Sequence, residues 1–138
     1  MRYLTLDIRE TLSVAAPINT VARLVQAIND GDLTAAVALY EPNAVLVVRP
    51  GQLARGAAAI RDALAGFVAI KATLRSDAQT VLEADDIALY LGRWSLRGTD
   101  PAGQAVLLNG ESTDILRRQP DGRWLIALDN PWGTQILT

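Results

Sequence analysis

The spacing of apolar residues predicts three helices in the first half of the chain. Across residues 18–28 they recur at helical spacing, which is typical of a helix with one buried face. A second helix begins at Leu33, carries Tyr40 on its inner face and ends at Pro42, whose ring cannot continue it. A third helix is predicted for the segment AAAIRDALAGF, residues 57–67.

Alternating or β-branched segments elsewhere predict strands. They lie at residues 2–9, 44–49, 70–83, 87–97, 104–118 and 123–129, the first as a half-buried edge strand. Short turns such as Pro120-Asp121-Gly122 join the long strands, so neighbours must be antiparallel. Strand 87–97 is apolar on both faces in its first half, which predicts cover on both sides.

Composition and charge indicate one folded domain. The chain has 138 residues, half of them apolar, with 13 basic and 15 acidic side chains and a net charge of −2. We expect a single domain over 1–138, with an N-terminal arm at 1–17 and a core at 18–132. Scattered arginines argue against a nucleic acid partner. No apolar run is long enough for a membrane span, and Asp7 and Glu10 would interrupt a signal peptide, so we expect a cytoplasmic protein.

The chain contains neither histidine nor cysteine. This excludes disulfides, thiol catalysis, zinc fingers and histidine bases, so an acid–base pair must come from Asp, Glu, Tyr or Arg. Glycine-rich phosphate loops are absent, and the acids lack the spacing of calcium or zinc ligands. We therefore predict that the protein uses no metal and no cofactor.

The order of helix, helix, strand, helix and a meander of antiparallel strands resembles the nuclear transport factor 2-like superfamily. Three segments carry the resemblance, which covers residues 18–132: INDGDLTAAVALYEPNAVLV, RGAAAIRDAL and RRQPDGRWLIALDNPWG. The chain looks most like the SnoaL-like branch, which is related to ketosteroid isomerase. The resemblance implies an α+β fold in which a cone-shaped, curved antiparallel sheet packs on three N-terminal helices, as in a cystatin-like roll.

The resemblance further implies an apolar small-molecule pocket at the open end of the cone and a homodimer formed by the outer face of the sheet. A dimer suits Ile87, Leu89 and Leu91, which need cover on the face opposite Tyr90 and Trp94. The alternative is a monomer whose N-terminal arm covers that face.

Two positions depart from the ketosteroid isomerase pattern. Val48 stands where the resemblance places the catalytic aspartate, and Leu24 stands where it places the oxyanion tyrosine. Isomerase chemistry needs a carboxylate and a hydrogen-bond donor at those places, so that mechanism is not expected here.

The centre of strand 104–118 is polar and is a candidate site. Asn109 and Glu111 lie on one face, whereas Ser112 and Asp114 lie on the other, and the pattern does not decide which face lines a pocket. Buried polar groups need partners, because an unpaired buried carboxylate is costly.

Glu111 has two interpretations. In one it faces the pocket as a catalytic base, paired with Arg49 or Arg93, and Arg49 and Asn109 bind ligand. In the other it forms an ion pair at the surface or in a dimer interface, as many charged residues outside functional sites do.

The remaining candidates lie on other elements. Asp129 either starts a turn or is a catalytic acid at the pocket rim, and Tyr40 is either a core tyrosine or a phenol donor. Trp94 is a ligand-binding candidate because Gly92, on the same face, leaves room beside it. Trp132 either closes the mouth of the cone over a ligand or packs at the dimer interface.

Two functions are open at this point. The first is an enzyme of isomerase, cyclase or hydratase type acting on a small apolar carbonyl compound. Glu111 or Asp129 would be its base, and Tyr40 or Arg49 would stabilise the oxyanion. The second is a non-catalytic homodimer that binds a small apolar ligand or serves as an association module.

Overall fold

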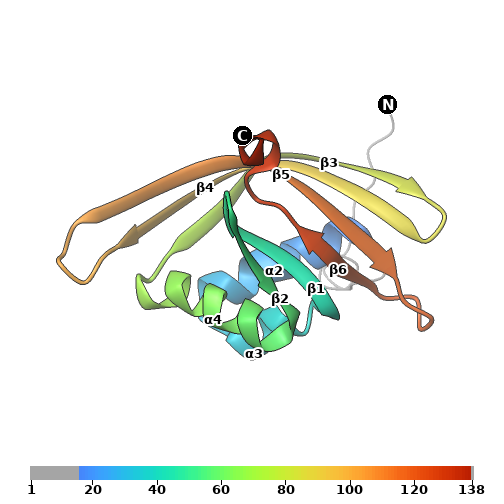
Figure 1. The fold of residues 1–138 in the computed structure, drawn as a ribbon, viewed down its shortest axis with the longest axis horizontal. Helices are drawn as coiled ribbons and strands as arrows, with labels where there is room; N and C mark the ends of the chain where they lie inside the picture. Colours follow the sequence, from blue (N-terminus) through green and yellow to red (C-terminus); the bar gives the residue numbers. More distant parts are fainter. Residues whose placement is uncertain (1–15, 138) are drawn as a thin grey trace, which may run out of the picture.

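The computed structural model describes residues 16–137, which form a curved sheet over helices (Figure 1). The helices are α2 (Pro17–Asp30), α3 (Leu33–Val37) and α4 (Gly56–Ala69), with a terminal 3₁₀ helix, η1 (Gly133–Ile136). The strands are β1 (Tyr40–Arg49), β2 (Gln52–Arg55), β3 (Thr73–Ala84), β4 (Ile87–Thr99), β5 (Ala105–Arg118) and β6 (Trp124–Asp129).

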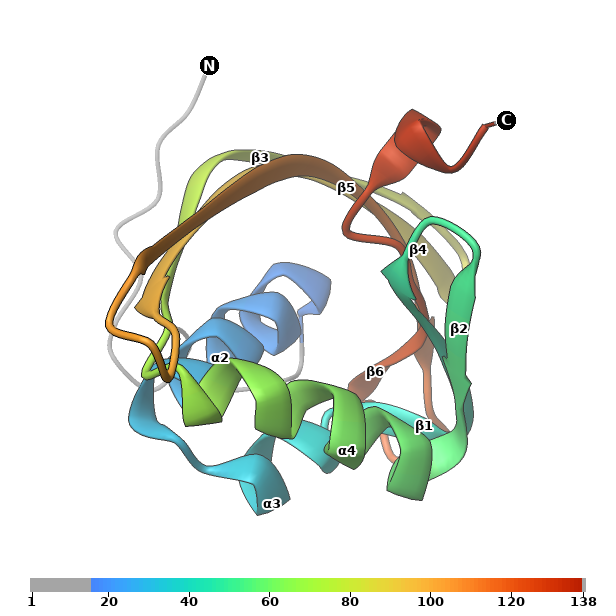
Figure 2. The same ribbon diagram turned by 60° about the vertical axis from the view of Figure 1, so that its left-hand side comes forward.

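The strands form one sheet in the order β2-β1-β6-β5-β4-β3. Figure 2 shows this sheet bending around α2 and α4 without closing, with β2 and β3 at its two edges and η1 outside the curve. The predicted α+β fold with a curved sheet on three helices is therefore confirmed. One pairing differs from the antiparallel prediction, because β1 and β6 are parallel neighbours.

The first and third predicted helices are confirmed as α2 and α4, but the second is shorter than predicted. It ends at Val37, and Tyr40 begins β1 instead of lying on a helix. The helical spacing continues to Tyr40, yet this residue pairs with Ile126 of β6, a contact that local spacing cannot reveal. Pro42 lies in β1 between the pairs formed by Tyr40 and Val45, where its missing N–H disrupts no ladder bond.

The long strands β3 to β6 are confirmed, with antiparallel pairing between successive neighbours. The turn at Pro50-Gly51 is also present, and it leads into β2, which the pattern did not predict. The predicted strand 2–9 lies outside the described residues, as does the predicted arm as far as residue 15.

The two faces of β4 differ in burial among the described residues, whereas the apolar pattern of this strand predicts cover on both faces. Ala88 and Tyr90 face the helices and are 0% and 3% exposed, whereas Ile87 is 45% exposed on the outer face. The core thus lies between the helices and the inner face of the sheet, around Ile60, Leu116 and Ile126. No helix in residues 16–137 has the length and apolar character needed to cross a membrane.

Candidate functional site

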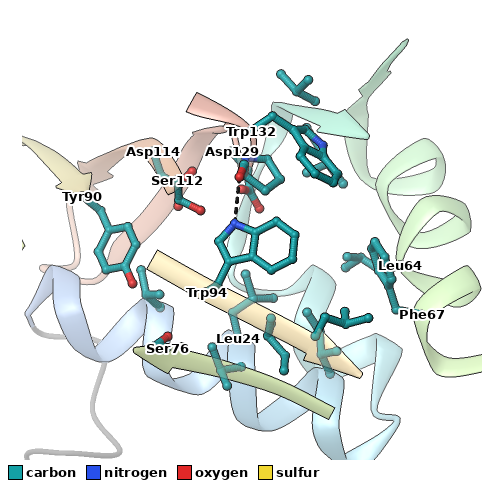
Figure 3. A pocket seen from close by; sticks show the side chains of 18 of the residues that line it. Leu24, Leu64, Phe67, Ser76, Tyr90, Trp94, Ser112, Asp114, Asp129 and Trp132 are labelled. Atoms are coloured by element: carbon teal, nitrogen blue, oxygen red, sulfur yellow. Dashed lines mark hydrogen bonds between the residues drawn. The ribbon is translucent and has the colours of Figure 1, made fainter. Parts of the chain in front are cut away.

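A cavity of about 100 Å³ lies between the helices and the inner face of the sheet. Its wall is mostly apolar: α2, β1 and α4 contribute aliphatic side chains, and Phe67, Trp94 and Trp132 contribute rings. Figure 3 shows Phe67 beside α4 and Trp94 at the centre of the pocket, with Ser112, Asp114 and Asp129 grouped on another side. An apolar chamber with a few polar groups at one end is the usual form of a small-molecule site.

The polar end is made by Tyr40 of β1, Asp114 of β5 and Asp129 of β6, which all line the cavity. Their exposed fractions are 5%, 5% and 7%, so all three are buried. The Tyr40 hydroxyl donates to Oδ2 of Asp129 over 2.6 Å, and the carboxyl groups of Asp114 and Asp129 are hydrogen-bonded to each other. The backbone N–H of Asn130 donates to Oδ1 of Asp114 over 2.8 Å.

A bulge in β6 brings the two carboxyl groups together. Ile115 of β5 pairs with Leu128, but the next residue, Leu116, pairs with Ile126, which leaves Ala127 without a partner. The extra residue reverses the alternation, so Ile126 faces the core, Leu128 is 39% exposed and the next residue, Asp129, faces inward. Bulges commonly redirect a side chain in this way next to functional sites.

Burial raises the pKa values of both carboxyl groups. Burial first, and then the charge of Asp129, raises the pKa of Asp114 well above its ordinary value. Burial also raises the pKa of Asp129, while hydrogen bonds from Tyr40 and Asp114 act in the opposite direction. Two adjacent buried carboxyl groups resist being ionised together, and the larger rise in pKa falls on Asp114. Burial and the nearby Asp129 likewise raise the pKa of Tyr40, which stays a neutral phenol.

The two tryptophans form a fixed apolar wall. Nε1 of Trp94 donates to the carbonyl of Pro131 over 2.7 Å, and Nε1 of Trp132 donates to the carbonyl of Val48 over 3.0 Å. Their rings meet edge to face with centroids 5.4 Å apart. A side chain at Gly110 would come within 2.9 Å of the Trp94 ring, so this close packing depends on glycine.

The space expected beside Trp94 at Gly92 is filled. A Cβ at Gly92 would lie 2.4 Å from the Tyr90 hydroxyl oxygen, because the Tyr90 ring covers this glycine. An aromatic ring over a strand glycine restores packing that the missing side chain would lose. The Tyr90 hydroxyl donates to Oε1 of Gln79 over 3.0 Å, and burial raises the pKa of Tyr90.

Of the residues nominated from the sequence, the cavity brings together Tyr40, Trp94, Asp129 and Trp132. Three others do not line it. Glu111 is exposed on the outer face, where its carboxylate lies 3.3 Å from Nε of Arg93. This matches the second interpretation of Glu111, an ion pair at the surface. Arg49 and Asn109 are also exposed, at the end of β1 and on the outer face of β5.

A family model describes the sequence directly. The SnoaL-like domain model matches residues 21–126, which is most of the chain. The chain belongs to the SnoaL-like domain family. A comparison with curated protein sequences finds no match.

Solved structures share the fold of this SnoaL-like domain. A nuclear transport factor 2-like superfamily protein from Salmonella enterica has a TM-score of 0.74 at 20% identity, over 85% of this chain and 88% of that one. A Xanthomonas campestris protein assigned as a calcium/calmodulin-dependent protein kinase II association domain has a TM-score of 0.69 at 24% identity, over 94% and 90%. SalBIII, an epoxide hydrolase/cyclase-like enzyme of pyran ring formation in salinomycin, has a TM-score of 0.66 at 21% identity, over 83% and 88%.

Asp114 lies in the polar strand that the sequence analysis singled out, but that analysis gave it no catalytic or binding role. Asp114 shares strand parity with Leu116, and the 0% exposure of Leu116 shows that this parity faces the core, a choice that the sequence pattern left open. Parity with a core leucine places this carboxyl on the inner face. Across residues 16–137, no three acidic side chains gather in an arrangement that could hold a metal ion.

Proposed function

We propose that this SnoaL-like protein is an enzyme that transfers protons on a small apolar carbonyl compound, using the Asp114–Asp129 pair as acid and base. The observation that carries the proposal is the position of two adjacent, buried carboxyl groups with raised pKa values at one end of an apolar cavity. Paired carboxyl groups with separated pKa values supply an acid and a base at the same pH.

The roles follow from the hydrogen bonds. Asp129 is the base: its carboxylate takes a proton from the carbon next to the substrate carbonyl, and Asp114 gives its own proton to the carbonyl oxygen. The product is an enol, and the enzyme regains its single shared proton. Tyr40 donates to Asp129 over 2.6 Å, so it orients the base and does not point its hydroxyl at the substrate. The similarity to a cyclase-like enzyme supports acid–base chemistry in this fold.

The test is exchange of the α-hydrogens of isopropyl methyl ketone in D₂O, followed by proton NMR. We expect exchange above the buffer rate, because enolisation exposes the α-carbon to solvent deuterons. Asp129→Asn should lower the protein-dependent rate by about a hundredfold or more, which is the usual contribution of a positioned base.

Glu111→Gln is the matched control, since Glu111 is a carboxylate in the same sheet that lies outside the cavity. It should exchange the ketone at the rate of the unaltered protein. Exchange at the buffer rate in the unaltered protein, or equal rates in the Asp129→Asn and Glu111→Gln variants, would refute the enzymatic proposal.

A second candidate function is a homodimeric association module. Leu82, Ile87 and Leu128 are 58%, 45% and 39% exposed on the outer face of the sheet, and exposed apolar side chains on one face favour a protein contact. The similarity to an association domain supports this candidate too.

Sedimentation velocity tests the dimer. Ile87→Glu should shift a dimer towards monomer, because a charge would be buried at the interface. Ala58→Glu is the control, since Ala58 is exposed on α4, on the side of the molecule opposite the outer face of the sheet. A monomer for the unaltered protein would exclude this candidate.

A further inference from the structure

Among residues 16–137, the side chains that line the cavity include acidic groups and no basic ones. The ionisable side chains in its wall are Tyr40, Tyr90, Asp114 and Asp129, from β1, β4, β5 and β6. α2 and α4 contribute only apolar side chains, and β3 contributes a leucine and a serine. In the described part of the chain, the arginines that form ion pairs have side chains 50% or more exposed, and none lines the cavity.

Most hydrogen-bond donors around the cavity are already occupied. The indole N–H groups of Trp94 and Trp132 bind backbone carbonyls, and the Tyr90 hydroxyl binds Gln79. The Tyr40 hydroxyl binds Asp129. The hydroxyls of Ser76 and Ser112 also line the cavity, and a carboxylic acid proton on Asp114 would be a stronger donor to a ligand than either hydroxyl.

We propose that the cavity selects small uncharged ligands with an oxygen acceptor, and that the charge on the Asp114–Asp129 pair excludes anions. This inference deepens the proposed function by naming the ligand class of its site, and it rests on that function. An uncharged carbonyl accepts the Asp114 proton without adding charge. An anion would lose its hydration on entering the cavity and would then lie beside a buried carboxylate with no basic side chain in the described wall. The two negative charges would repel each other strongly, because the dielectric constant of a buried site is low.

The cavity also limits ligand size. Its volume is about 100 Å³, smaller than the ~150 Å³ apolar cavity known to hold benzene. Benzene itself has six non-hydrogen atoms, so about that number is the upper limit for a ligand in this smaller cavity.

The proposal is tested with four compounds that share one branched shape and size but differ in charge, so that a difference in affinity reports on charge alone. Isopropyl methyl ketone and isobutyramide are uncharged, isobutyrate is an anion, and isobutyramidinium is a cation. Their dissociation constants for the intact protein at about pH 7 are measured from chemical-shift changes in protein NMR spectra, in the millimolar range expected for compounds so small.

We expect the ketone and the amide to bind at least about tenfold more tightly than isobutyrate, a difference of about 1.4 kcal/mol in binding free energy. Isobutyrate binding as tightly as isobutyramide would overturn the exclusion of anions. Isobutyramidinium binding more tightly than isobutyramide would also overturn the proposal, because the site would then select cations.

The two aspartates should respond differently to substitution. Asp129→Asn leaves Asp114, whose buried carboxyl can stay neutral, so isobutyrate should approach the affinity of isobutyramide. Asp114→Asn leaves the charge on Asp129, so the discrimination should persist. Glu111→Gln removes a carboxylate outside the cavity and should leave it unchanged. Loss of discrimination in Glu111→Gln, or its retention in Asp129→Asn, would refute the assignment.

The comparison of isosteric ligands uses the intact protein, so it does not depend on whether a variant folds. Its outcome is also independent of the test of catalysis. Selective binding of the uncharged compounds without exchange of the ketone hydrogens would remove the proposed enzymatic function and leave the ligand class standing. If isobutyrate binds as tightly as isobutyramide, the proposed selection of uncharged ligands is wrong, whatever the exchange rate of the ketone hydrogens.

Discussion

At the residue scale, the burial of Asp114 and Asp129 couples their protons to folding. Both carboxyl groups are exposed to water in the unfolded chain and ionise near their ordinary value of 3.8. In the folded protein burial raises both pKa values, so the native state binds more protons than the unfolded chain at mildly acidic pH. The pair should therefore make the stability of the protein depend on pH.

The sign of this dependence is set by the raised pKa values. The contribution of Asp114 to stability is fully present below about pH 4 and is lost as the pH rises through its folded pKa. In that window the free energy of unfolding should fall by about 1.4 kcal/mol per pH unit for each proton that only the folded state holds. Urea denaturation from about pH 4 upward measures this slope.

Asp114→Asn should flatten that slope, since the amide keeps a hydrogen-bond donor and cannot ionise. Asp121→Asn is a control at an exposed carboxyl whose pKa is lowered by hydrogen bonds from Arg123, so its contribution has the opposite sign. A wild-type stability that does not fall with rising pH would show that the pair holds no proton in the folded state.

At the element scale, the bulge in β6 decides which side chains face the cavity. Without it, the alternation from Trp124 and Ile126 would place Leu128 inside and Asp129 outside. Ala127 is the extra residue, and the sequence around it contains no glycine or proline to mark the irregularity. The bulge is thus a property of the pairing between β5 and β6, and local pattern cannot reveal it.

The same distinction explains what the sequence could and could not predict. Helices α2 and α4 and strands β3 to β6 have local periodicity, and all were predicted. Tyr40 was placed on a helix because its spacing from Val37 is helical, whereas its position in β1 depends on a partner 86 positions away, Ile126. In the site, parity places Asp114 on the face opposite Glu111 but does not show which face is inward, and the inward position of Asp129 requires the bulge.

Deletion of Ala127 tests the role of the bulge. Regular pairing would turn Asp129 to the outer face and Leu128 inward, so catalysed exchange of the ketone hydrogens should be lost. The protein should also be destabilised by about 2 kcal/mol or more, because core packing changes.

Deletion of Ala102, in the exposed turn between β4 and β5, is the control for shortening the chain by one residue. It should leave the exchange rate close to that of the unaltered protein. Unchanged exchange after deletion of Ala127 would mean that the bulge does not place Asp129.

At the scale of the whole molecule, the sheet does not close, so its edge must be held against the helices. β3 is an edge strand, and α2 is the helix that packs on it. The Asn29 side chain at the end of α2 donates to the carbonyl of Leu74 over 3.0 Å and accepts from its N–H over 2.7 Å. This amide thus binds the edge strand as a neighbouring strand would.

The Asn29 contact also supports the cavity, because Ile28 and Leu74 both line it. Asn29→Ala removes both hydrogen bonds and should cost about 1–2 kcal/mol in the free energy of unfolding. Hydrogen exchange at the Leu74 amide should accelerate, since this edge would open locally.

If the edge forms part of the cavity wall, Asn29→Ala should also weaken binding of isopropyl methyl ketone, while an Ala substitution at the exposed Asn43 should not. Faster exchange at Leu74 with unchanged ketone affinity would separate the two effects. The wall would then be held by the apolar contacts of α2 alone, and the open edge of the sheet would have no part in ligand binding.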